Sequence, residues 1–206
     1  MKPALLFLFM YILFPGEITA QTEKKMESSE GLDIPYSKIP DAPDFYSAGN
    51  IAARVIDGLG FRYFWATEGL REVDLQFKPS DEARTTAETL DHIYGLSRVI
   101  LNATLQQAND PANAAGELNF EDKRGKTLEN FKKASDKLKA SGDVALEEYK
   151  VVFKRGENFS EFPFWNLLNG PIADALWHTG QVASFRRSSG NPINPKISVF
   201  TGSVRE

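Results

Sequence analysis

The residues best suited to chemistry in this sequence are its only two histidines, His92 and His178, since the chain has no cysteine. Asp174 precedes His178 by four residues, so in a helix their side chains would lie one turn apart on the same face. Apolar residues flank this face, which predicts that it points inward. A carboxylate and an imidazole in a core need a partner, because an unpaired buried charge is costly. A divalent cation is one such partner, with nitrogen and oxygen as its ligands.

His92 is the candidate for a third ligand. It belongs to another amphipathic segment, on a face that also carries Leu96 and Val99. If that segment is a helix beside the one with Asp174 and His178, two imidazoles and a carboxylate can surround one ion. Three protein ligands that leave a position open for water or substrate are typical of catalytic sites. Zinc, nickel, manganese or iron would each suit such a set. Spacing alone also allows an intrahelical hydrogen bond between the aspartate and its neighbouring histidine.

Glu68 is the candidate for a general base. It shares a predicted helix face with Phe61, Phe64 and Trp65, an unusual place for a carboxylate unless it is paired. Burial among aromatic rings would suit it to accept a proton from water. The alternative is a salt bridge with Arg62, with Arg71 or with a neighbouring helix, and the sequence favours that structural role.

Hydrophobic periodicity indicates the elements that must position these residues. The second helix has the clearest start, because Thr85 and Glu88 have the spacing of a capping box. Gly190 is a natural end for the last helix. Residues 109–125 read as a long connection. These patterns predict an all-α fold, an antiparallel four-helix bundle with a long crossover, with helices over residues 45–70, 85–105, 127–140 and 171–188.

A small β-hairpin is predicted just before the last helix. Tyr149, Val151 and Phe153 alternate with more polar residues, which is typical of a strand. Residues 155–158 read Arg-Gly-Glu-Asn and could form the turn.

The ligand-bearing segments resemble those of a known family. The last helix contains an H-x-G-Q element, which in the DinB-like (DinB/YfiT) metalloenzymes follows another histidine by four residues. The second helix is similar to that family's other ligand helix. The resemblance covers about residues 47–190. The motifs that carry it are His178-Thr179-Gly180-Gln181, then Phe185-Arg186-Arg187 and Gly190, together with Pro79-Ser80, Thr86, Glu88 and His92.

The resemblance implies a four-helix bundle that binds a divalent metal ion through His92, Asp174 and His178. Members of the family catalyse thiol transfer, isomerisation or hydrolysis. This chain departs from the commonest pattern of three histidines, because Asp174 stands where a histidine is expected. Aspartate is still a competent ligand, so the resemblance predicts an altered site whose metal and affinity are open.

The N-terminus has the pattern of a secretory signal. Lys2 precedes an apolar run over residues 4–14, and Ile18-Thr19-Ala20 suits cleavage after Ala20. The run is too short to span a bilayer, which needs about 20 residues, although an uncleaved anchor is the alternative. We therefore expect an exported, periplasmic or secreted protein with a signal peptide at 1–20, an irregular lead-in at 21–44 and the bundle domain at 45–206.

Composition limits the partners. Removing residues 1–20 takes away one Lys and one Glu, so the formal net charge stays at −4. This argues against nucleic acid, which requires a basic surface. No later segment suits a membrane, so we expect a small-molecule substrate of unknown identity, and a homodimer is left open. Export disfavours cytoplasmic thiol cofactors and so favours hydrolysis. The alternatives are a non-catalytic metal-binding or scaffold protein of the same fold, and a partner-binding segment at residues 185–195.

Overall fold

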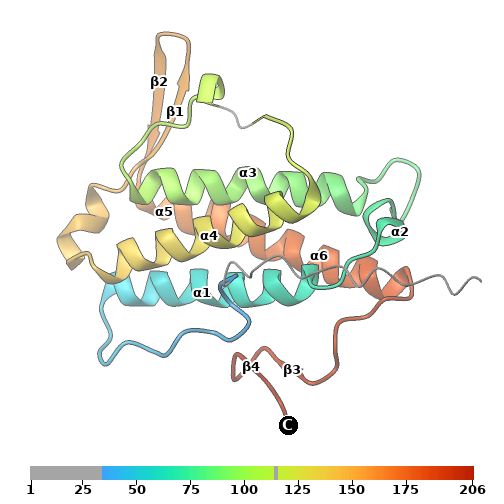
Figure 1. Cartoon of the computed structure of the whole chain (residues 1–206). Coiled ribbons are helices and arrows are strands. Elements are labelled where there is room, and N and C mark those ends of the chain that lie inside the picture. Colours follow the sequence, from blue (N-terminus) through green and yellow to red (C-terminus); the bar gives the residue numbers. More distant parts are fainter. Residues whose placement is uncertain (1–33, 114–115) are drawn as a thin grey trace, which may run out of the picture. The chain divides into compact units, whose positions relative to one another are not determined.

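The computed structural model describes residues 34–113 and 116–206 (Figure 1). The signal peptide predicted at 1–20 and the first part of the lead-in, residues 21–33, lie outside the described residues. Within the described part, no helix is long and apolar enough to cross a membrane.

Four long helices dominate the described chain and confirm its mostly helical class. Helix α1 lies against α4 and α6, and α3 also lies against both. The end of α1 meets the start of α4 through Glu68 and Arg124, so these two helices are antiparallel. Asp91 and Lys123, which pair near the starts of α3 and α4, show that those helices run in the same direction. Two helices that run in the same direction need a long connection, because the chain must return from the end of α3 to the start of α4. The helices are α1 (Ala48–Thr67), α3 (Thr86–Thr104), α4 (Phe120–Lys139) and α6 (Ala173–Ser188).

Side chains cap the starts of the first three long helices. The predicted capping box is present, because the hydroxyl of Thr85 accepts from the backbone N–H of Glu88 while that carboxylate accepts from the Thr85 N–H. Ser47 caps α1 in the same way. Asn119 caps α4, which therefore begins well before the predicted residue 127. The sequence prediction missed this start because the first two turns of α4 are mostly charged.

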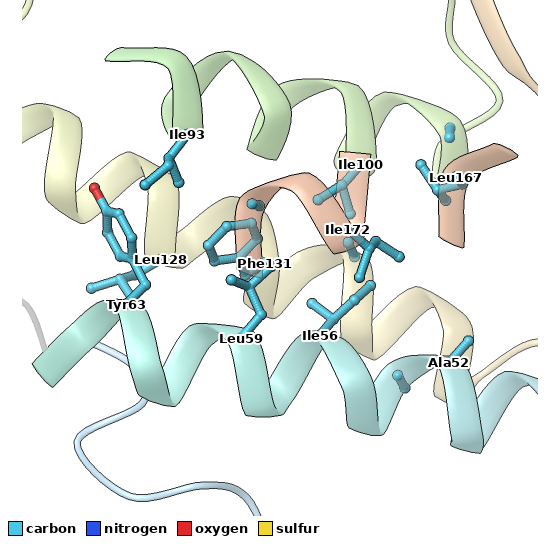
Figure 2. Packing of buried hydrophobic residues seen from close by; sticks show 14 of the residues in the cluster. Ala52, Ile56, Leu59, Tyr63, Ile93, Ile100, Leu128, Phe131, Leu167 and Ile172 are labelled. Atoms are coloured by element: carbon cyan, nitrogen blue, oxygen red, sulfur yellow. The ribbon is translucent and has the colours of Figure 1, made fainter. Parts of the chain in front are cut away.

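Apolar side chains from all four long helices fill the centre, together with residues of the segment that leads into α6. Tyr63 and Phe131 meet edge to face, with ring centroids 6.0 Å apart. Figure 2 shows much of this core, including Ile56, Leu59 and Tyr63 of α1, Ile93 and Ile100 of α3, Leu128 and Phe131 of α4, and Leu167 and Ile172.

Small residues let α1 approach its neighbours closely. A side chain at Gly49 would collide with the carbonyl oxygen of Leu138 in α4. A Cβ at Gly60 would lie 2.5 Å from the ring of Tyr36. Ile51 and Val55, although apolar, are exposed.

The lead-in is fastened to the helices by a buried charge cluster. The hydroxyl of Tyr36 donates to Oδ1 of Asp57, 3.0 Å away, and Nζ of Lys139 lies 2.7 Å from Oδ2. Asp57 is fully buried. Burial and the adjacent carboxylate raise the pKa of Tyr36 well above its usual range. The cluster links the lead-in, α1 and α4.

Two small antiparallel strand pairs complete the fold. The predicted hairpin is present as β1 (Val151–Arg155) and β2 (Asn158–Phe162), and Gly156 takes a positive φ in the turn. Asn109, in the crossover, bonds to the backbone of β1 on its other side. The tail, expected to be extended, also forms the short pair β3 (Ile197–Ser198) and β4 (Ser203–Val204).

The end of α6 is tied to the end of α1 and to a short helix, α2 (Glu72–Leu75), that the sequence did not predict. Arg186 is buried and donates to the carbonyl groups of Trp65, Ala66 and Glu68. Its guanidinium thus satisfies carbonyls that the helix end leaves open. Arg186 is therefore not solvated at a free helix end, because the end of α1 lies beside it.

Asp74 of α2 is the acidic centre of this junction. Its buried carboxylate accepts from the side chains of Arg71, Ser189 and Asn191 at 2.6 to 2.8 Å. The Arg71 guanidinium, helped by Ser189 and Asn191, holds the pKa of Asp74 well below its usual range although burial opposes this shift. The ionised carboxylate therefore stabilises the fold.

Replacement Asp74→Asn is expected to lower the free energy of unfolding at pH 7 by about 2–4 kcal/mol, since it removes the charge-assisted bonds that this buried carboxylate accepts. A carboxyl group with a depressed folded-state pKa stabilises above its unfolded pKa, near 4, and loses that contribution as pH falls further. Urea denaturation should thus show a large difference between variant and wild type at pH 7 and a smaller one at pH 3. An equal difference at both pH values would contradict the ionised role.

Candidate metal centre

The three predicted metal ligands meet where α3 and α6 pack together. Nε2 of His92 on α3 lies 3.1 Å from Oδ2 of Asp174, and Nε2 of His178 lies 3.3 Å from Oδ1 of the same carboxylate. The imidazole centroids are 4.7 Å apart, with the rings nearly perpendicular. One potential ligand atom from each residue lies within 4.8 Å of the other two. The group could hold a metal ion.

These distances fit a small divalent cation. Ligand bonds of about 2.0–2.2 Å place adjacent ligand atoms about 3–3.5 Å apart around one ion. Both nitrogen–oxygen distances fall in that range. Asp174 lies between the two imidazoles, so its charge would partly neutralise the ion.

Gln181 determines which nitrogen of His178 is available. Nδ1 of His178 lies 2.7 Å from the side-chain oxygen of Gln181, which can only accept a hydrogen bond. When Nδ1 donates to this oxygen, Nε2 of the neutral ring presents a lone pair. A bond of this kind to the second ring nitrogen is usual for histidines that bind metals.

The Asp174–His178 contact then needs a positive charge between its atoms. A lone pair on Nε2 would face a carboxylate oxygen 3.3 Å away, and two acceptors repel at that distance. A cation between them or a second proton on the ring would remove the repulsion. His92 differs, because a neutral ring with its proton on Nε2 can donate to Asp174 directly. The intrahelical hydrogen bond considered from the sequence thus requires a charged His178.

The site lies at the edge of the core. The buried face of α6 consists of Ala175, Thr179, Val182 and Arg186. The exposed fractions of the side chains are 35% for His92, 40% for Asp174 and 16% for His178. We predicted that the face of α6 with Asp174 and His178 points into the core. That prediction was too strong, because both side chains turn towards α3 at the edge of the core. An ion held there would be open to solvent on one side.

The helix before the site is irregular. A short helix, α5 (Phe164–Leu167), leads into a wide turn, η3 (Leu168–Ile172), and only then does α6 begin, not at Pro171 as expected. Gly170 has non-helical angles, φ −97° and ψ −105°. Wide turns of this kind are frequent at functional sites. Nothing in the residue pattern except Gly170-Pro171 signals this irregularity.

This turn borders a cavity of about 390 Å³ beside Asp174. The walls of the cavity come from two segments that are distant in the sequence. Its lining consists of Leu96 from α3, Asn169, Gly170 and Pro171 from the turn, and Ala173, Asp174 and Trp177 from α6.

Glu68, the predicted general base, lies at the C-terminal cap of α1 and outside the three-residue group. Its half-exposed carboxylate pairs with the buried guanidinium of Arg124 on α4, and Arg124 also donates to the hydroxyl of Thr67. The salt bridge that the sequence offered as the alternative role of Glu68 is therefore present, and its cation, Arg124, comes from the neighbouring helix α4.

Comparison with known proteins adds no relative: no family model matches the chain, and neither a curated protein nor a solved structure is significantly similar to it.

Proposed function

We propose that this chain is an exported, DinB-like four-helix bundle that binds a divalent metal ion through His92, Asp174 and His178. In this proposal the signal is cut after Ala20 and the ion serves the hydrolysis of a small molecule. The observation that carries it is the approach of two imidazole nitrogens to one carboxylate at 3.1 and 3.3 Å, from two separate helices. The family assignment rests on the motifs around those residues.

A bound divalent ion would act as a Lewis acid and bring the pKa of a coordinated water to about 7. The residues of the chain have distinct parts in this chemistry. Asp174 would offset the positive charge, and it contacts both imidazoles. Gln181 holds the proton on Nδ1 of His178, which leaves Nε2 as the ligand atom. The partial exposure of the group leaves a side from which water and substrate can enter.

Glu68 as the general base remains a prediction. Its pairing with Arg124 favours a structural role between α1 and α4. Asp174 is an alternative acceptor for a proton from water, because one carboxylate oxygen can bind the ion while the other accepts.

The test is a zinc titration of chelator-treated protein without an affinity tag. We expect about one ion per chain in the wild type and none at the same concentrations in His92→Ala and Asp174→Ala. Asp91→Asn is the matched control, since this carboxylate adjoins His92 on α3 but pairs with Lys123. Wild-type stoichiometry in the His92 and Asp174 variants would refute the ligand set.

Hydrolysis is tested separately with a panel of esters, amides and lactones. Turnover by the zinc-loaded wild type that disappears with the chelator would support an enzyme. Zinc binding without turnover of any compound would favour the non-catalytic metal-binding alternative.

A further inference from the structure

We propose that the cavity beside Asp174 receives a flat, uncharged aromatic or apolar group of a small molecule whose polar end binds the metal. This inference rests on the proposed metal site and adds the kind of molecule that the site selects. It assigns Leu96 and Trp177 as residues that determine specificity.

Trp177 is the main observation. Its side chain is 72% exposed, although indole is among the most costly side chains to leave in water. It lies three residues after Asp174, so the two side chains are neighbours on the surface of α6. The core does not need it, because the inward face of α6 is filled by Ala175, Thr179 and Val182. Because Trp177 also lines the cavity beside Asp174, its exposed ring is placed to contact a molecule bound there.

Leu96 occupies the corresponding place on the opposite helix. It lies four residues after His92, so it neighbours this second ligand on α3 as Trp177 neighbours Asp174 on α6. The cavity lies between these two apolar side chains, and the wide turn at residues 169–171 closes its end. Asp174 belongs both to the ligand group and to the cavity wall. A molecule bound to the ion beside Asp174 can therefore extend into the cavity.

The size of the cavity and the charge of its lining limit the class of molecule that can bind in it. At about 390 Å³ the cavity is near the lower end of the range of about 300–1,000 Å³ for small-molecule sites. Asp174 is the charged residue of its lining, and no lysine or arginine contributes to it. A carboxylate or phosphate would therefore be repelled in the cavity. A neutral ring of modest size fits its walls, and the donor atoms belong at the metal end.

The test compares two hydroxamates that bind zinc through the same two oxygens, acetohydroxamate and benzohydroxamate. The zinc-loaded full chain is titrated with each, and the affinities are corrected for those of the free metal. We expect benzohydroxamate to bind about 10–100-fold more tightly, which corresponds to burial of one aromatic ring. Trp177→Ala should remove most of this preference, so that the two hydroxamates bind with similar affinities. Trp165→Ala is the matched control, since it is 76% exposed and lines a different cavity.

Equal affinity of the two hydroxamates for the wild type would overturn the inference, as would an unchanged preference in Trp177→Ala. Zinc content is measured first in each sample. A wild type that takes up no zinc contradicts the proposed metal site itself. A wild type with zinc but no preference contradicts only the assignment of the cavity.

Discussion

Replacement of His178 by alanine is expected to cause the largest loss of metal affinity of any single change that spares the fold. His178 is the least exposed of the three candidate ligands, and its ring is held in place by the contact of Nδ1 with Gln181. Loss of a residue that only supports a ligand lowers metal affinity by about 10–100-fold. We expect His178→Ala to lower the zinc affinity by much more than that. Competition against a fluorescent zinc chelator measures this loss.

The variant Gln181→Leu provides a reference with which the loss of zinc affinity in His178→Ala can be compared. Gln181→Leu removes the acceptor for Nδ1 of His178 but leaves all three ligands in place, so affinity should fall by about 10–100-fold. Circular dichroism should show unchanged helicity in both variants. A His178→Ala protein that binds zinc as tightly as Gln181→Leu would mean that residue 178 is not a ligand.

Replacement of Asp57 by alanine is expected to have the largest effect on stability among the charged residues. The substitution removes a fully buried carboxylate and leaves the buried Tyr36 hydroxyl and the partly buried Lys139 ammonium without their shared partner. Breaking a buried pair in this way costs about 3–5 kcal/mol. Urea denaturation followed by circular dichroism measures the change.

Asp136→Ala is the control for this prediction. Asp136 is also an aspartate of a long helix, but it forms an exposed i,i+4 pair with Lys132 on α4. Such pairs contribute about 0–1 kcal/mol. Comparable losses in the Asp57 and Asp136 variants would show that the buried cluster does not stabilise the fold as we infer.

The sequence predicted those parts of the structure that depend on local rules. Thr85 and Glu88 have a spacing that only a helix start satisfies, and the capping box is present. The turn at Gly156 follows in the same way from a short loop between alternating segments. The adjacency of Asp174 and His178 is a property of helix geometry, so it needed no knowledge of the tertiary structure. That His92 would meet them was an inference from helix neighbours, and the structure brings the three together.

The parts that the sequence did not predict depend on distant partners. The Arg124 that pairs with Glu68 lies 56 residues away, and nothing near Glu68 indicates it. Arg186 looked like a solvated end residue because the carbonyl groups that it reaches belong to α1. Ile51 and Val55 are apolar residues one turn apart on α1, yet both are exposed, and it is Gly49 that lies closely against α4. The wide turn at Gly170 was missed because its φ and ψ angles have no periodic signature.

The separation of His92 and Asp174 along the chain has a consequence for folding. These residues are 82 positions apart, so an ion held by both would enclose the crossover, α4 and the hairpin in a closed loop. A loop of that length costs little more entropy to close than one half as long. Because the ligands converge only in the folded state, the free energy of coordination would add to that of folding. The metal would then act as a reversible cross-link, and the supply of free metal would govern how long the folded chain survives.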